Sequence, residues 1–207
     1  MTTPTSALRI ASDKSLLLYS NFKKHKYSDM KKMISSKLIL TVLALLLTTL
    51  LWSQEDKSKR PSPPATVTGT VNGATITIDY SSPGVKGRKI WGDLVPYDKV
   101  WRAGANEATL FTTSKDILVE GKKLPAGKYS LYAIPGEKDW VIIFNSKTGQ
   151  WGVKDDESTT EEPASDVLRV TVKPEKSSAF NERMKFVIDG KGFALEWENL
   201  RVPVSVQ

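Results

Sequence analysis

The sequence predicts one all-β domain over residues 65–207, an antiparallel β-sandwich of jelly-roll type with short helices at most. Two observations support this fold class. Short runs of β-branched and aromatic residues recur after Pro64, separated by turn signals roughly every 8–12 residues. No segment in this part keeps apolar residues at the 3.6-residue period of a helix. The chain beyond residue 64 is therefore expected to consist of strands and loops.

The first two predicted strands, 65–71 and 74–80, flank Asn72-Gly73, which is the strongest short signal for a β-hairpin. In the second strand Ile76, Ile78 and Tyr80 alternate with polar residues, so one face of the strand is expected to be buried. Gly-rich residues 189–192 predict another hairpin near the C-terminus. The other predicted strands are 107–113, 116–120, 128–134, 140–145, 167–172, 184–188 and 193–197.

The N-terminal part predicts export. Residues 30–53 resemble a signal peptide, with a basic start and a run of 14 residues without charge at 38–51, too short for the roughly 20 residues of a membrane-spanning helix. Ser53 supplies a small residue before the expected cut. Residues 1–29 are interpreted as a misassigned upstream extension, and 54–64 as a flexible leader. The alternative is a genuine cytoplasmic extension, with 38–51 as a marginal anchor.

The amino-acid composition excludes several classes of function. The chain carries 30 Lys and Arg against 23 Asp and Glu, but residues 1–53 hold eight of these basic residues and two of the acidic ones, so the exported part has a net charge near +1. Such a domain has no general attraction for nucleic acid. It has no cysteine, and the single histidine, His25, precedes the expected cut. Ser-His-Asp and Cys-His catalysis and ordinary zinc sites are therefore excluded.

The exported part is thus expected to be soluble, without a cofactor, a metal, a disulfide or a stable membrane anchor after cleavage. The sequence does not separate the periplasm from the extracellular medium.

Two long segments interrupt the strands, at 81–106 and 154–166, and long loops in compact domains are usually functional or disordered. The second loop is acidic. Its oxygen ligands would suit calcium, but its spacing is not that of an EF-hand and its composition favours a solvated loop.

The first long segment also carries a resemblance to a known family. Residues 101–109 read Trp-Arg-Ala-Gly-Ala-Asn-Glu-Ala-Thr, after 87–97 (GRKIWGDLVPY) and before 124–129 (LPAGKY) and 133–136 (AIPG). These motifs resemble an uncharacterised domain-of-unknown-function family of exported proteins found in Bacteroidetes-type bacteria. The resemblance covers nearly all of residues 65–200. It implies export and a single compact domain, and it implies no established activity.

A binding surface is the preferred interpretation of the 88–107 loop region. Aromatic rings stack on sugars and other planar groups, arginine binds carboxylates or phosphates with two hydrogen bonds, and asparagine both donates and accepts. Export makes a glycan, a peptide or a cell-wall fragment the expected ligand. The candidate binding residues are Arg88, Trp91, Trp101, Arg102, Asn106 and Glu107.

Two alternatives stay open at this point. The same residues can be structural, with Trp101 filling the core, Arg102 paired internally and Asn106 supporting a turn; the protein would then act by interactions in the envelope. The other alternative is a glycan hydrolase that depends on carboxylates, for which Asp93 and Glu107 are the nearest pair. Catalysis is the less favoured reading, because many loops contain two acidic residues.

Overall fold

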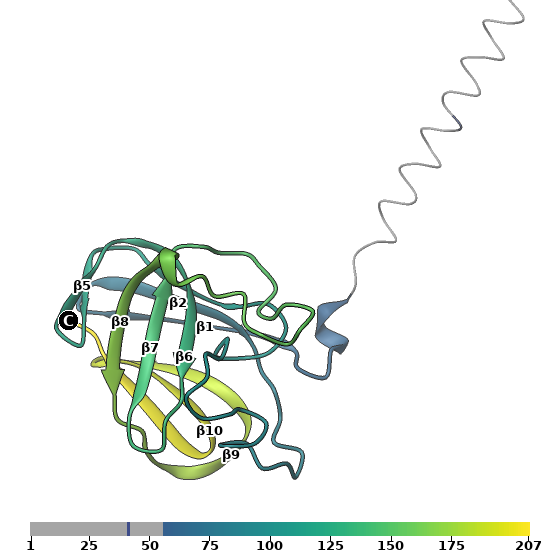
Figure 1. The fold of residues 1–207 in the computed structure, drawn as a ribbon. Coiled ribbons are helices and arrows are strands. Elements are labelled where there is room, and N and C mark those ends of the chain that lie inside the picture. Colours follow the sequence, from purple (N-terminus) through teal and green to yellow (C-terminus); the bar gives the residue numbers. More distant parts are fainter. Residues whose placement is uncertain (1–40, 42–55) are drawn as a thin grey trace, which may run out of the picture. The chain divides into compact units, whose positions relative to one another are not determined.

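A computed structural model describes Thr41 and residues 56–207. The predicted signal peptide and the upstream extension lie outside the described residues, apart from Thr41. Residues Asp56–Gln207 form one compact unit, drawn in colour in Figure 1. Within the described part of the chain, no helix is both long and apolar enough to cross a membrane.

The larger layer of this unit is a six-stranded antiparallel sheet in the order β1-β2-β3-β6-β7-β8. Each strand lies beside the next one in the chain, except that the small hairpin β4–β5 intervenes between β3 and β6. The strand bounds are β1 Pro64–Val71, β2 Ala74–Ser81, β3 Thr109–Thr113, β4 Ile117–Val119, β5 Lys122–Leu124, β6 Gly127–Ile134, β7 Trp140–Asn145 and β8 Asp166–Val172.

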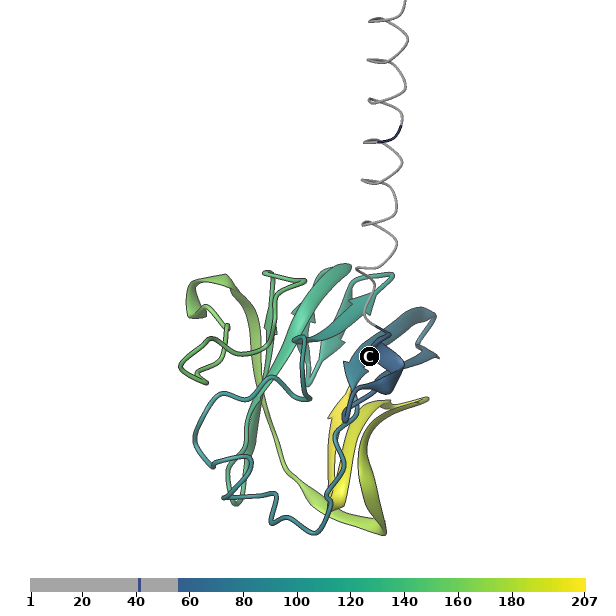
Figure 2. The same ribbon diagram turned by 90° about the vertical axis from the view of Figure 1, so that its right-hand side faces the viewer.

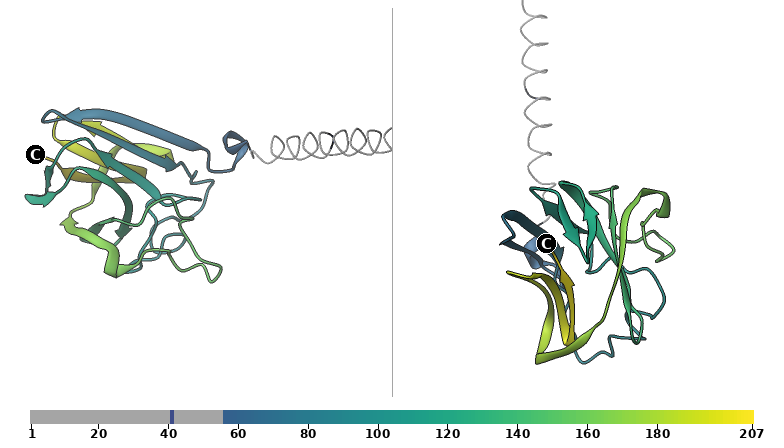
Figure 3. Two further views of the ribbon diagram at one scale, coloured as in Figure 1. Left: turned by 90° about the horizontal axis from the view of Figure 1, so that it is seen from above. Right: turned by 90° about the vertical axis from the view of Figure 1, so that its left-hand side faces the viewer.

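The second layer is a long antiparallel hairpin of β9 (Glu175–Asp189) and β10 (Gly192–Ser205). Figure 2 shows this hairpin, in yellow, facing the larger sheet across the interior. Strand β9 also approaches edge strand β1, where Gly69 leaves room for Ile188: a Cβ at Gly69 would lie 2.6 Å from Ile188 Cγ2. The left view of Figure 3 shows β1 and β2, in blue, beside the hairpin. The C-terminus joins β4 through a bridge between Val119 and Val206.

The all-β sandwich predicted from the sequence is confirmed. Besides strands, residues 56–207 contain only two three-residue 3-10 helices, η1 (Lys57–Lys59) and η2 (Pro163–Ser165). The connections differ from the expected jelly-roll type. The larger sheet is a meander, because consecutive strands are neighbours, whereas a jelly roll joins its two sheets by Greek-key crossings.

Local chemistry explains the parts of the fold that were predicted well. Asn72 (φ 48°) and Gly73 (φ 77°) both adopt the left-handed conformation that a two-residue hairpin turn requires. Alternation buries Ile76 and Ile78 completely, and strand β7 has the predicted bounds. The hairpin β9–β10 extends well beyond the predicted strands 184–188 and 193–197. The extra residues of β9 are mostly polar and the register shifts twice, so periodicity gave no signal in that strand. In β10 Leu200, Val202 and Val204 do alternate with other residues, and the prediction did not include them.

The core lies between the two layers and is almost entirely apolar. Aromatic contacts run across it: Phe111 of β3 lies 5.1 Å from Phe144 of β7 and 5.4 Å from Phe193 of β10, measured between ring centroids. All three side chains are buried. Because these rings come from both layers, the sandwich cannot open without exposing them to water, and this burial is the main source of its stability.

Candidate functional site

The segment between β2 and β3 lies against the end of the larger sheet, where it places the predicted site residues. Trp101 exchanges two backbone hydrogen bonds with Ala133 of β6, at 2.7 and 2.8 Å, and the Asp98 amide donates to the Pro135 carbonyl at 2.8 Å. The segment is therefore fixed to β6 like a short extra strand. Successive side chains on such a strand point to opposite sides, so Trp101 and Arg102 face different environments.

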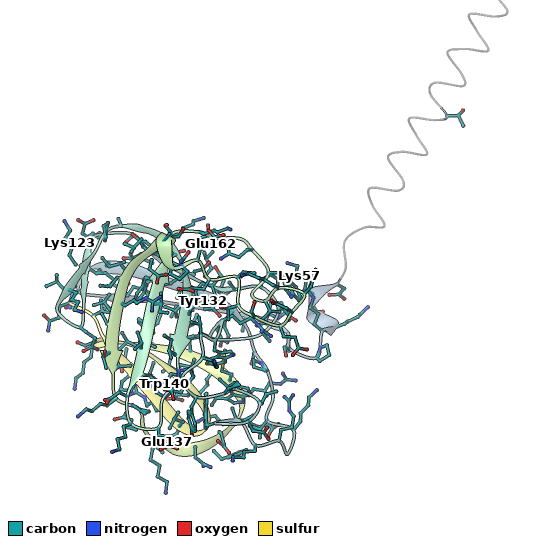
Figure 4. The ribbon with its side chains drawn as sticks, in the orientation of Figure 1. Lys57, Lys123, Tyr132, Glu137, Trp140 and Glu162 are labelled. Atoms are coloured by element: carbon teal, nitrogen blue, oxygen red, sulfur yellow. The ribbon has the colours of Figure 1, made fainter. Side chains whose placement is uncertain are left out.

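Trp101 faces the core and belongs to a cluster of four tryptophans, with Trp91, Trp140 and Trp197. Trp101 is 9% exposed and stacks on Trp197 of β10, with ring centroids 6.1 Å apart and planes 17° from parallel. Trp91 packs edge-on against the other three rings, at centroid distances of 5.0 to 5.9 Å. Figure 4 labels Trp140 at one end of β7. The cluster joins the loop to both layers, so the rings of Trp91 and Trp101 serve packing.

The guanidinium of Arg88 is also hydrogen-bonded within the protein. Its Nε donates to the Val85 carbonyl at 3.1 Å, and Nη2 donates to the Gly84 carbonyl at 2.6 Å. Both acceptors precede Arg88 by three or four residues, so its guanidinium closes a local turn. The exposed remainder of this side chain is the only part left for a ligand.

A tight turn follows Arg102. Ala103 (φ 51°) and Asn106 (φ 58°) are both left-handed, which is unusual for residues other than glycine. The turn is held by side chains: Asn106 Nδ2 donates to the Ser62 carbonyl at 2.9 Å and to Ser81 Oγ at 3.1 Å, and Thr109 Oγ1 donates to the Ala103 carbonyl at 2.9 Å. Asn106 thus supports the turn and fastens the residues before β1 to the end of β2.

Glu107 forms an ion-pair group at the surface. Its carboxylate accepts hydrogen bonds from Lys57 Nζ at 2.8 Å and from Arg60 Nη1 at 3.0 and 3.1 Å. Partial burial alone would raise the pKa of Glu107, but the hydrogen bonds from Lys57 and Arg60 outweigh it and lower the pKa to about 2. Glu107 is therefore an ionised acceptor at every physiological pH. A general acid in glycoside hydrolysis needs a raised pKa, so Glu107 does not suit that role.

Lys57 and Arg60 belong to the segment predicted to be a flexible leader. Lys57 begins η1, and Asp56 caps this helix by accepting from the Ser58 amide at 3.1 Å. Figure 4 labels Lys57 beside η1. The basic residues of this segment contact Glu107, so the described part of the leader is docked on the domain rather than separate from it.

Trp151 completes this surface. Glu107 and Trp151 are directly opposite in a short antiparallel bridge, so their side chains lie on the same side of it. Trp151 is 48% exposed, and the Arg60 guanidinium lies 5.7 Å from its ring centroid, within reach of a cation–π interaction. We call Glu107, Arg60, Lys57 and Trp151 the Glu107 surface. The segment carrying Trp151, between β7 and β8, reaches toward η1 in Figure 1.

A hollow of about 270 Å³ adjoins the Glu107 surface, at the ends of β1, β2 and β3. Its walls are largely apolar, and its charged groups come from Lys57, Glu107 and Asp79. A hollow with apolar walls and a few convergent polar groups is what a small-ligand site needs. The other lining residues include Pro64, Ala65, Tyr80, Ala108 and Leu110.

Arg102 lies on the opposite side of the same bridge. Its stem passes beneath Gly152, where a Cβ would lie within 2.9 Å of Arg102 Cβ and 3.0 Å of Cγ, and closer still to Cδ. Its Nε is buried without a hydrogen-bond partner, and none of the described residues forms an ion pair with its guanidinium. Burial lowers the pKa of Arg102, and no neighbouring group offsets that effect. Arg102 is thus a half-buried cation without a partner among residues 56–207.

The acidic loop is not wholly solvated. Glu161 is buried, and Arg169 Nη2 donates to its carboxylate at 2.8 Å. Gln150 Nε2 donates to Tyr132 OH at 2.9 Å, and Asn145 Nδ2 donates to the Glu162 carbonyl at 2.9 Å, so segment 146–165 is bonded to the outer face of β6 and β7. Among residues 56–207 no three His, Cys, Asp or Glu side chains are grouped closely enough to hold a metal ion.

A larger hollow, of about 560 Å³, lies near the turn between β9 and β10. Arg201 at its wall is paired with Glu175 at 3.0 Å, Glu196 at 3.2 Å and Asp189 at 3.4 Å. Burial alone would lower the pKa of Arg201, but hydrogen bonds to Glu175 and Glu196 raise it. The guanidinium of Arg201 is therefore fully paired with carboxylates of the protein.

The structure thus brings together only part of the predicted set. Glu107 lies on the surface beside a hollow, Arg102 lies behind it, and Trp91, Trp101, Arg88 and Asn106 support the fold. Sequence reasoning did not place Lys57, Arg60, Trp151 or Gly152 at the site. Trp151 lies near Gly149 and Gly152 in the sequence, and that neighbourhood did not decide between the core and the surface.

These features define a class of protein: an all-β sandwich whose motif residues are divided between a tryptophan core and a charged surface. The chain belongs to the family described as "Protein of unknown function (DUF2911)", whose model matches residues 62–206. The resemblance carried by residues 101–109, to an uncharacterised family, is thereby confirmed. Comparisons with curated proteins and with solved structures gave no match.

Proposed function

We propose that this protein is exported and binds a ligand at the Glu107 surface, where the 88–107 region meets the segment before β1 and the segment after β7. The observation that carries the proposal is Trp151. Its ring is 48% exposed, lies within cation–π reach of Arg60 and is paired across the bridge with Glu107, whose ionised carboxylate lines a largely apolar hollow, so an aromatic face and a hydrogen-bond acceptor are offered together.

A glycan fits this chemistry best among the expected ligands. A sugar ring presents an apolar face to an aromatic ring, and its hydroxyls donate to a carboxylate. Glu107, with a pKa of about 2, stays an acceptor for such hydroxyls across the pH range of any bacterial surroundings. A peptide or a cell-wall fragment would use the same surface through an apolar side chain and a backbone amide.

The test is a binding screen of residues 54–207 against neutral oligosaccharides, cell-wall fragments and peptides. Binding is detected by thermal melting and by tryptophan fluorescence. Trp151→Ala and Glu107→Gln are the diagnostic variants. Phe180→Ala is the matched control, because Phe180 is 55% exposed, lies on β9 and does not line the hollow. We expect a ligand that stabilises the parent and the control and does not stabilise Trp151→Ala.

The proposal fails if every ligand that binds the parent binds Trp151→Ala and Glu107→Gln equally well. Binding of protein partners from the envelope, with no small ligand, would favour the structural alternative instead. Export is tested separately, by fractionation and N-terminal sequencing: a cytoplasmic protein that retains residues 30–53 would contradict it.

A further inference from the structure

Arg102 has an environment that its role in the fold does not explain. Arginine side chains that are half buried are normally paired, because removing a charge from water costs free energy that a partner must offset. Arg201 and Arg169 follow this rule and contact carboxylates at 3.0 and 2.8 Å. Arg102 has no such contact with any of residues 56–207.

The chain also makes room for this side chain. Gly152 has no positive φ that would require glycine, so an alanine could adopt its backbone conformation. What glycine provides is space, because a Cβ at this position would overlap the stem of Arg102. The glycine thus gives the Arg102 stem a defined path, while its guanidinium is left without a counter-charge among the described residues.

From these observations we propose that Arg102 is the anchor of an oxyanion-binding site, which takes the carboxylate or phosphate group of a ligand or partner. Guanidinium is suited to this role, because its fixed fork of N–H donors matches the two oxygens of such a group. Its Nε–H is buried and lacks an acceptor among the described residues, so the two parallel donors to such a group come from the terminal Nη1 and Nη2 nitrogens.

This site is distinct from the Glu107 surface. Glu107 and Trp151 project from one side of their bridge, whereas Arg102 contacts Gly152 on the other side. The carboxylate of Glu107 is paired with Lys57 and Arg60, and it forms no ion pair with Arg102. The inference therefore does not depend on the glycan proposal, and either one can fail without the other.

The test uses residues 54–207 labelled with nitrogen-15, titrated at constant ionic strength with inorganic phosphate, with galacturonate and, as a control, with chloride. The Nε–Hε resonance of Arg102 is the direct readout, assigned by its loss in Arg102→Met. We expect a saturable shift of this resonance with phosphate or galacturonate and none with chloride. Which of the two anions binds more tightly distinguishes a phosphate ligand from a carboxylate ligand.

Three variants complete the design. Arg102→Met keeps the apolar stem, and Arg102→Lys keeps the charge without the fork; both are expected to weaken anion binding by about tenfold or more, as for loss of a bidentate charge-assisted contact. Arg88→Met is the matched control, because that guanidinium is bonded to the Val85 and Gly84 carbonyls. Equal binding by Arg102→Met and the parent, or no saturable shift of the Arg102 resonance in the folded parent, would overturn the proposal.

Discussion

The two sides of the Trp101–Arg102 segment differ in what their side chains contact. On the inner side, Trp101 contacts three other tryptophan rings and is almost fully buried. On the outer side, Arg102 is half buried without a partner among the described residues. Adjacent residues of one motif thus serve different purposes. Complete packing indicates a contribution to stability, whereas an unsatisfied charge indicates a contact made with something outside the chain.

The largest expected effect is a loss of stability when the tryptophan cluster on the inner side is disrupted. Trp101→Ala removes a ring from the four-tryptophan cluster, so we expect the free energy of unfolding to fall by about 3–5 kcal/mol. Trp151→Ala, the exposed counterpart, should cost under about 1 kcal/mol. Urea denaturation followed by circular dichroism measures both. A Trp101→Ala protein as stable as Trp151→Ala would show that the cluster does not hold the loop to the two layers.

The contact between the Arg102 stem and Gly152 gives the second largest effect. Gly152→Ala places a Cβ against Arg102, so we expect a loss of about 1–3 kcal/mol, the range for an overpacked site. Arg102→Ala should remove much of that penalty when the two changes are combined, because Cγ and Cδ are gone and only the contact with the Cβ of residue 102 remains. A double-mutant cycle by urea denaturation measures the coupling. Additive losses would mean that Gly152 is needed for another reason.

These two contacts also show what sequence reasoning could reach. Asn72-Gly73 and the alternation around Ile76 and Ile78 are local patterns, and their turn and their buried face were predicted correctly. The overlap of Gly152 with Arg102 joins residues 50 positions apart, and no period or motif relates them. Whether Trp101 faces a ligand or the core is likewise decided by its neighbours in space, Trp140 and Trp197.

The candidate site was predictable only in part, for the same reason. Glu107 was singled out because it lies within a specific motif, but its partners Lys57 and Arg60 precede the strands, in a segment whose charge and prolines predict a free leader. Charge pairing with a distant carboxylate leaves no signal in composition. The residues that surround Glu107 and form the Glu107 surface with it could therefore be identified only from the structure.

The outer side should respond differently to loss of its charge. Arg102→Met keeps the stem beneath Gly152 and removes a cation that has no partner among the described residues, so stability is expected to change by no more than about 1 kcal/mol. Thermal and urea melts of the parent, Arg102→Met and Arg201→Met measure this. Arg201→Met should be the less stable variant, because it leaves Glu175, Glu196 and Asp189 without their shared cation. The reverse order would show that Arg102 serves the fold.

The smallest expected effect is the contribution of the Glu107 ion pairs to stability at low pH. Its pKa is about 2 in the folded protein against an ordinary value of 4.5, so its ion pairs contribute stability that is fully present above about pH 4.5 and is lost as the pH falls through 2. Exposed pairs of this kind contribute under about 1 kcal/mol, so Glu107→Gln should be slightly less stable than the parent at pH 7. The two proteins should converge as the pH approaches 2. Urea melts from pH 2 to 7 measure the difference, and a nuclear magnetic resonance titration of the Glu107 carboxyl gives its pKa directly. A midpoint near 4.5 would mean that Lys57 and Arg60 do not hold Glu107 in solution, and the docked segment before β1 would then be free to expose the hollow beneath it.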